Sequence, residues 1–147
     1  MKHPLSRGRA MAALLAALAA TAPLANAVTP DSTARVIALS DNAFAGSSVN
    51  VLANVHQTLF TEGIYQYAAW YAADGSLTLA KRRLGEDRWE IRASPYKGDV
   101  KDAHNHIALA VDGAGYVHVA FDHHNNPLRY ARGKAPGSIE LSALGPM

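Results

Sequence analysis

The chain has 147 residues, with 14 Lys and Arg against 12 Asp and Glu, and it contains no cysteine. The lack of cysteine excludes a disulfide framework and the lipid attachment of bacterial lipoproteins, so stability outside the cell must come from packing. Three cations, Lys2, Arg7 and Arg9, lie before Val28; without them 14 − 3 = 11 cations face 12 anions, and this balance argues against nucleic acid as a partner.

Residues 1–27 have the pattern of a secretory signal peptide. A basic start is followed by an apolar stretch over residues 10–20 and by the small residues Ala25 and Ala27. We expect cleavage after Ala27 and a secreted or periplasmic product with no membrane anchor left. A transmembrane anchor is the alternative, but the apolar run is shorter than the roughly 18–20 residues of a spanning helix and is interrupted by Pro23.

The domain that follows, residues 28–147, is predicted to be all-β. Its apolar segments are short, rich in Val, Ile, Leu, Tyr and Trp, and separated by Gly, Asp, Asn and Pro, and none keeps a helical spacing over three turns. The expected strands cover residues 34–39, 48–55, 64–72, 77–84, 88–93, 106–112, 116–122, 128–132 and 139–144.

Two Asp-Gly pairs mark expected hairpin turns within this series. Asp74-Gly75 and Asp112-Gly113 each separate two strands, and they lie 112 − 74 = 38 positions apart. A period near 40 with three or four strands per unit favours a β-propeller over a β-sandwich. Because a propeller needs about four to eight blades, we expect two to three blades of an incomplete ring. A truncated gene or sequence piece explains this better than a small domain that closes by oligomerising.

Histidines concentrate on the expected hairpin over residues 102–130, which holds five of the seven in the chain. A turn centred on Gly113-Ala114 places His106 roughly opposite Phe121 and His104 opposite His123, to within one residue. The two ends of the hairpin then bring together residues 102–106 and 122–126. We expect this cluster to contain His104, Asn105, His106, His123, His124, Asn125 and Asn126.

Three interpretations of these histidines compete. Isolated histidines among apolar neighbours, such as His56 and His118, fit a structural role. A metal site is possible because imidazoles two residues apart can bind zinc, but the stretch lacks Cys and Glu, and we expect no required cofactor while leaving a structural ion open. The third interpretation is acid–base chemistry on a polar substrate. The cations Lys81 to Arg83 are expected to form a solvated face.

Longer motifs carry a family resemblance. The segment DAHNHIALAVDGAGYVHVAFDHHNNPLRYARG, with QYAAWYAADGSLTLAKRRLG and RWE before it, resembles the BNR-repeat-containing family. Its characterised relatives are seven-bladed β-propeller ulvan lyases, rhamnose–glucuronate lyases and a rhamnosidase branch. The resemblance covers about Ser47 to Pro136, the first blades of such a ring. The Ser-x-Asp-x-Gly-x-Thr-Trp box of sialidases is absent, which argues against sialic acid as substrate.

This resemblance implies a function and a set of site residues. It implies a secreted polysaccharide lyase that cleaves an acidic, uronate-containing glycan by β-elimination. The alternatives are a rhamnosidase-type hydrolase and a non-catalytic carbohydrate-binding propeller. The implied catalytic residues are His124 and His104, with Asn105, His123 and Asn125 as substrate-binding residues and no metal.

The roles within this set are unequal. We expect His124 to take part in proton transfer and His104 with Asn105 to hold the substrate carboxylate or support the base; which histidine is the base stays open. The resemblance assigns a carboxylate-binding arginine and a catalytic tyrosine to later blades. Arg129 and Tyr130 are therefore expected to serve strand packing.

Overall fold

The computed structural model describes residues 36–51 and 57–146, which contain seven strands and no helix. This confirms the all-β prediction, and no helix among these residues is long and apolar enough to cross a membrane. The expected signal peptide and His56 lie outside the described residues. The strands are β1 (Leu59–Glu62), β2 (Tyr65–Tyr71), β3 (Ser76–Arg83), β4 (Glu90–Lys97), β5 (Ile107–Val111), β6 (Val117–Phe121) and β7 (Arg129–Arg132).

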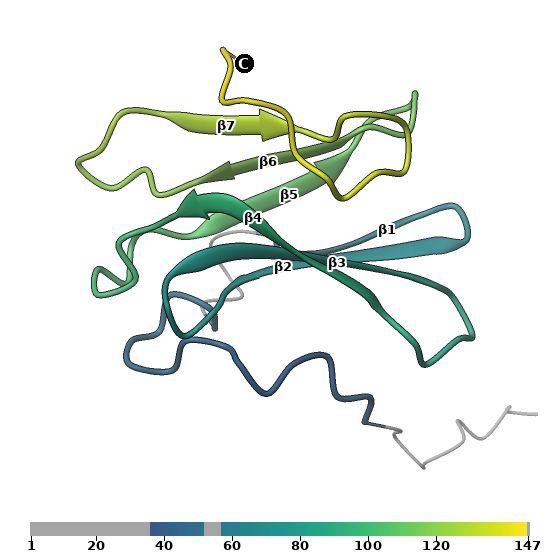
Figure 1. Cartoon of the computed structure of the whole chain (residues 1–147), viewed down its shortest axis with the longest axis horizontal. Helices are drawn as coiled ribbons and strands as arrows, with labels where there is room; N and C mark the ends of the chain where they lie inside the picture. The colour runs from purple at the N-terminus through teal and green to yellow at the C-terminus, as the bar shows by residue number, and fades with distance from the viewer. Residues whose placement is uncertain (1–35, 52–56, 147) are drawn as a thin grey trace, which may run out of the picture. The chain divides into compact units, whose positions relative to one another are not determined.

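The strands form two antiparallel sheets in which each strand pairs with its neighbour in sequence. One sheet has the order β1-β2-β3-β4 and the other the order β5-β6-β7 (Figure 1). Both are open meanders, and one face of each packs against the other through a shared apolar core. Face-to-face packing of successive meanders is how propeller blades are arranged. The fold is therefore part of a β-propeller, with two of its sheets in the described residues.

Strict alternation on the central strands explains this core. Val117, Val119 and Phe121 of β6 are fully buried, while His118 and Ala120 between them point to the other face and are partly exposed. The first sheet contributes Tyr71, Leu77 and Leu79 to the same core. A period of two places every second side chain on one face, so these residues face the neighbouring sheet, whereas Ala68, Trp70 and Ala80 form a second apolar cluster with Leu39 and Trp89.

The two predicted turns share one geometry. In the second turn, however, the glycine with a positive φ is Gly115, whereas the sequence predicts Gly113. Ala72 N–H donates to Ser76 O (2.8 Å) and Asp112 N–H donates to Tyr116 O (3.0 Å), so each turn encloses three residues. The left-handed residue is the last of these three, Gly75 (φ 82°) in one turn and Gly115 (φ 84°) in the other. Gly113 does not have a positive φ, and the equivalent glycines lie 115 − 75 = 40 positions apart rather than 38.

This turn also moves the expected register of the histidine hairpin by one residue. Ala110 pairs with His118 and Ile107 with Phe121, whereas a turn centred on Gly113-Ala114 would place His106 opposite Phe121. The reason lies in the Asp112 carboxylate, which accepts the N–H groups of Ala114 and Tyr116 at 2.9 Å each. These bonds stabilise a three-residue loop that ends in a left-handed glycine.

The strand predictions are wrong mainly at the edges. The sequence patterns do not predict the four-residue strand β1, which is largely exposed and is followed by Gly63, whose φ of 55° allows the turn into β2. Residues 36–39 and 48–51 form no strand, and residues 139–144 form only an isolated bridge between Leu141 and Gly133. Apolar composition favours strands in these segments, but pairing needs a neighbouring strand edge that composition does not reveal.

Candidate functional site

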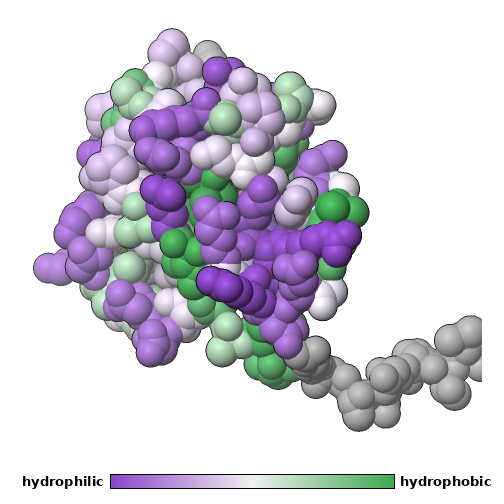
Figure 2. Space-filling model, turned by 45° about the vertical axis from the view of Figure 1, so that its right-hand side comes forward, coloured by the Kyte–Doolittle hydropathy of each residue, from purple (hydrophilic) through white to green (hydrophobic). Residues whose placement is uncertain are grey.

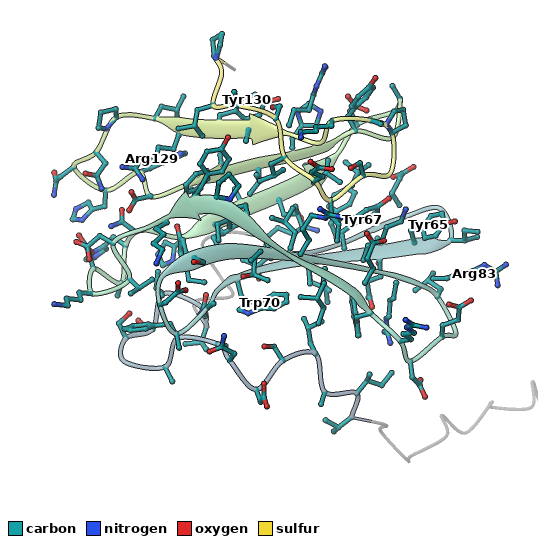
Figure 3. The ribbon with its side chains drawn as sticks, viewed as in Figure 1. Tyr65, Tyr67, Trp70, Arg83, Arg129 and Tyr130 are labelled. Carbon is teal, nitrogen blue, oxygen red and sulfur yellow. The ribbon has the colours of Figure 1, made fainter. Side chains whose placement is uncertain are left out.

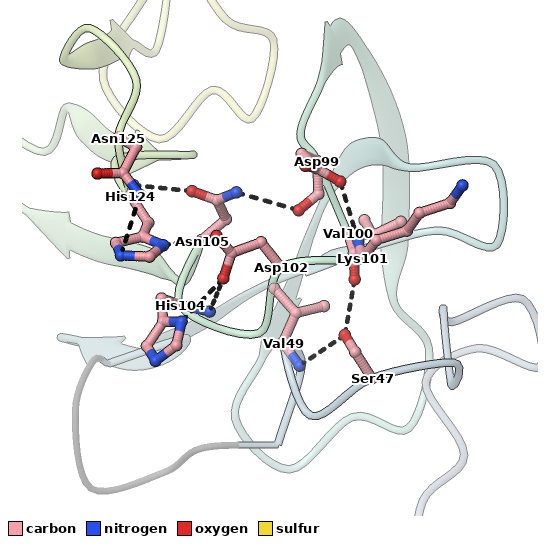
Figure 4. A network of polar contacts seen from close by, with 10 residues as sticks. All are labelled: Ser47, Val49, Asp99, Val100, Lys101, Asp102, His104, Asn105, His124 and Asn125. Atoms are coloured by element: carbon pink, nitrogen blue, oxygen red, sulfur yellow. Dashed lines mark hydrogen bonds and ion pairs between the residues drawn. The ribbon is translucent and has the colours of Figure 1, made fainter.

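Asp102, His104 and His124 meet at one end of the β5–β6 hairpin and are called the histidine cluster here (Figure 4). His104 Nδ1 lies 2.8 Å from Asp102 Oδ1, and His124 Nδ1 lies 2.5 Å from Asp102 Oδ2. The two imidazole centroids are 4.5 Å apart. Continuing the Ile107–Phe121 pairing three residues outward on each strand brings His104 opposite His124, so the corrected register accounts for their meeting.

The Asp102 carboxylate determines which nitrogen of each imidazole faces it and carries a proton. The hydrogen bond from His124 is the main reason that the pKa of Asp102 lies well below its usual range, followed by the backbone N–H and then the ring of His104. An ionised carboxylate only accepts hydrogen bonds, so the Nδ1 atom of each ring carries a proton and each Nε2 atom points away from Asp102. The side chains of His104 and His124 are 71% and 42% exposed. Two neighbouring imidazoles are thus open to solvent.

Asn105 lies beneath this cluster and is only 1% exposed. Its Oδ1 accepts the backbone N–H of His124 at 2.8 Å, and its Nδ2 donates to Asp99 O at 3.1 Å. The expectation that Asn105 contacts substrate does not fit this burial, because the oxygen and the nitrogen of its side-chain amide both form hydrogen bonds with backbone groups. The residue instead ties the loop that carries Asp102 to the loop that carries His124.

The other expected binding residues lie on the loop after β6. Asn125 is exposed, has a φ of 57°, and its Nδ2 lies 3.3 Å from His124 Nε2, so it belongs with the cluster. His123 is exposed as well, but its Nε2 lies 3.1 Å from Arg129 O, away from the two clustered rings. The structure therefore brings Asn125 to His124 and directs His123 toward the start of β7.

An ion pair between the buried Asp122 and the partly exposed Arg129 holds this loop in place. Asp122 has a φ of 58°, and its carboxylate, 3% exposed, lies 3.0 Å from the Arg129 guanidinium and accepts Asp99 N–H at 2.8 Å. Arg129 also donates to Lys97 O at 2.8 Å. Arg129 therefore joins the end of β4 to the loop that follows β6.

His118 is not the isolated structural histidine that the sequence suggests. Its Nε2 lies 2.9 Å from Asp112 Oδ2, and its Nδ1 lies 2.5 Å from the Tyr130 hydroxyl. The ring of Tyr130 stacks on His118 at 5.8 Å. His118 therefore links the β5–β6 turn to β7 through side chains and lies apart from the histidine cluster. His106 is buried beside Asn105.

The sequence analysis assigns no role to Asp102, and it assigns to Asp112 only a place in a hairpin turn. Each accepts a backbone N–H two residues along the chain, from His104 at 2.9 Å and from Ala114 at 2.9 Å, and uses its other contacts to hold an imidazole. Aspartate favours this local turn. An Asp two residues before a histidine in a loop is the available signal for Asp102.

The histidine cluster has the residue types of a metal site. One ligand atom from each of Asp102, His104 and His124 lies within 4.8 Å of the others. Two imidazoles and a carboxylate suit a zinc ion, which would need a further ligand. The same three residues also suit acid–base chemistry, since the carboxylate already orients both rings. The expectation that no metal is required stays a prediction.

Comparison with known proteins agrees with the sheet architecture. The family model described as "BNR repeat-containing family member" matches residues 65–147, which is more than half of the chain and includes β2 to β7. A search among curated proteins finds no match. With its repeated antiparallel sheets and this match, the chain belongs to the BNR repeat-containing family.

Proposed function

We propose that this protein is a secreted polysaccharide lyase that cleaves uronate-containing glycans, of the ulvan or rhamnose–glucuronate type, by β-elimination. The observation that carries the proposal is the pair of exposed imidazoles, 4.5 Å apart, on one shared carboxylate. The resemblance of its histidine motifs to those of the lyases gives the same reaction class.

The proposed reaction moves one proton off carbon and one onto oxygen. A base takes the proton from C5 of the uronate, the C5–H electrons form the C4=C5 double bond, and the C4–O4 bond breaks. An acid then protonates the leaving O4. The C5 proton is too weakly acidic unless hydrogen-bond donors neutralise the neighbouring carboxylate, and stabilising that developing charge is usually the largest contribution.

The cluster offers groups for these tasks. His124 Nε2 is the ring atom turned away from Asp102 and lies 3.3 Å from Asn125 Nδ2, and it is the atom that we assign to proton transfer. His104, more exposed and beside it, would hold the substrate carboxylate or exchange roles with His124. Asp102 fixes both rings, and Asn105 acts through the backbone of His124 rather than by touching the sugar.

The test is a product analysis on an acidic glycan that contains rhamnose and glucuronate. A lyase raises the ultraviolet absorbance because its product contains a conjugated unsaturated uronate. A hydrolase releases reducing sugar without that absorbance, and a binding propeller does neither. The assay uses the chain as printed and, if the reading frame continues past Met147, the longer product. Reducing sugar without new absorbance from an active preparation would replace the lyase proposal with the hydrolase.

A further inference from the structure

A basic hollow of about 500 Å³ lies where β3 leads into β4. Its cations are Lys81, Arg82, Arg83 and Arg88, and its acids are Glu86 and Glu90. Tyr65 and Trp89 complete the lining. Four cations against two anions leave 4 − 2 = 2 positive charges in the hollow, although the chain from Val28 onward has 11 cations and 12 anions. This hollow therefore concentrates positive charge on an otherwise nearly neutral domain.

Two of the four cations are held by neighbouring groups of the protein. Lys81 Nζ donates to Gly137 O at 2.8 Å and lies 4.1 Å from the centre of the Tyr65 ring. Arg82 Nε donates to Gln66 Oε1 at 2.8 Å, and its guanidinium lies 4.7 Å from the centre of the Trp89 ring. These contacts hold both charges in place against aromatic faces.

The other two cations are open. Arg83 and Arg88 are exposed, and neither forms an ion pair with an acid among the residues that the structure describes. Each guanidinium presents a planar fork of N–H donors that fits a carboxylate or a sulfate. In Figure 2 strongly hydrophilic side chains gather on the side of the molecule turned toward the viewer, the side that is on the right in Figure 1.

The basic hollow is remote from the histidine cluster. Strand β3 begins at Ser76, directly after Gly75. The Gly75 carbonyl accepts the N–H of Gly98 at 3.1 Å, and Gly98 begins the loop that carries Asp102, so this end of β3 lies next to that loop. Arg83 ends the same strand, roughly 23 Å away at 3.3 Å per residue. Figure 3 places Tyr65 and Arg83 at one end of the strands and Arg129 toward the other.

We propose that the basic hollow is a second binding site for an anionic polysaccharide, which Arg83 and Arg88 hold through carboxylate or sulfate groups. Each of its two open guanidiniums can bind one anionic group of a sugar chain. Nucleic acid is less suited, because its dense phosphate charge calls for a broader basic surface than this domain offers. The binding does not depend on the proposed lyase reaction, because it uses none of the histidine cluster.

The test measures binding by titration calorimetry at low salt, with polygalacturonate as the acidic probe and dextran as the neutral one. Arg83→Gln with Arg88→Gln should weaken polygalacturonate binding about tenfold, the loss expected for two exposed charge contacts. Arg92→Gln with Lys134→Gln is the matched control, because it removes the same charge at two cations that already pair with Glu140. It should change binding by less than about twofold.

Further arms separate this site from the histidine cluster and from other partners. His124→Ala should bind polygalacturonate as the unchanged protein does, and dextran should not bind. Equal weakening in the two double variants, or unchanged binding in Arg83→Gln with Arg88→Gln, would overturn the proposal. So would loss of binding in His124→Ala, or tighter binding of a short DNA duplex or of anionic lipid vesicles than of polygalacturonate. A protein with no lyase activity that passes these tests keeps the second site and loses only the proposed reaction.

Discussion

The imidazoles of His104 and His124 lie 4.5 Å apart, although 124 − 104 = 20 positions separate them in the chain, and each gives a hydrogen bond to one oxygen of Asp102. A carboxylate that takes one imidazole on each oxygen fixes the orientation of both rings. If the two rings act on one sugar, Asp102 is the residue on which their geometry depends. Predictions for the site therefore begin with this aspartate.

Asp102→Asn should lower the rate of glycan cleavage by about 100-fold or more, the scale of a lost general acid–base contribution. The amide lacks the charge that attracts both Nδ1–H groups, so the orientation of the two rings is no longer fixed. The measurement is the initial rate of ultraviolet absorbance increase. Asp74→Asn is the matched control, since Asp74 also accepts a backbone N–H in a turn and pairs with Lys97 at 2.8 Å. A fall of similar size in both variants would assign the loss to folding instead of the site.

Acid should weaken the contribution of Asp102 to stability. Its folded pKa is depressed, mainly by the hydrogen bond from His124, so the stabilisation is present above the ordinary carboxyl value of 3.8 and is lost as pH falls below that value toward the folded pKa. Thermal unfolding of the protein and of Asp102→Asn, followed from pH 7 downward, should show a gap in midpoint that narrows below pH 3.8. A gap that stays constant or widens on acidification would mean that Asp102 is not ionised and bonded as described.

Asn105→Ala should destabilise the protein by about 1–3 kcal/mol, because it removes two hydrogen bonds of the buried Asn105 amide, one from the His124 N–H and one to the Asp99 carbonyl. Chemical denaturation measures this loss. Asn126→Ala, on the exposed part of the neighbouring loop, is the control and should change stability by less than about 0.5 kcal/mol. If Asn105→Ala unfolds like the control but loses substrate affinity, Asn105 is a binding residue after all.

Much of the central fold could be predicted because alternation is a local signal. Strands β2, β3, β5 and β6 match their predicted ranges to within two residues at each end, since apolar residues at every second position reveal a half-buried strand. Edge elements are harder to predict. The exposed strand β1 has no apolar alternation, and the apolar residues around Leu141 meet only Gly133 as a bridge partner.

The second turn shows why the register could not be fixed from sequence. Asp112-Gly113 matches a favoured turn pair, yet Gly115, two residues later, can also be the left-handed residue of the turn. Which glycine takes that position depends on whether the Asp112 carboxylate accepts the N–H groups of Ala114 and Tyr116. One residue of slip changes which side chains meet across the hairpin. The meeting of the two histidine segments could be predicted, but their joint dependence on Asp102 required coordinates.

Replacement of the turn glycines tests this correction. Gly115→Ala should destabilise the protein by about 1–2 kcal/mol, because its φ of 84° is unfavourable for a residue with a Cβ atom. Gly113→Ala should be close to neutral, since an added Cβ atom there meets nothing within 4 Å and the backbone is not left-handed. Equilibrium denaturation compares the two. The opposite order would restore the turn predicted from Asp112-Gly113.

The most direct measurement of the central claim is an NMR titration of the histidine side chains with a glucuronate-containing oligosaccharide. The ring signals of His104 and His124 should shift together with one dissociation constant, while those of His118, bonded to Asp112 and Tyr130 elsewhere on the sheet, stay in place. Signals of His104 and His124 that do not respond, or that saturate at different oligosaccharide concentrations, would contradict a shared sugar site on Asp102.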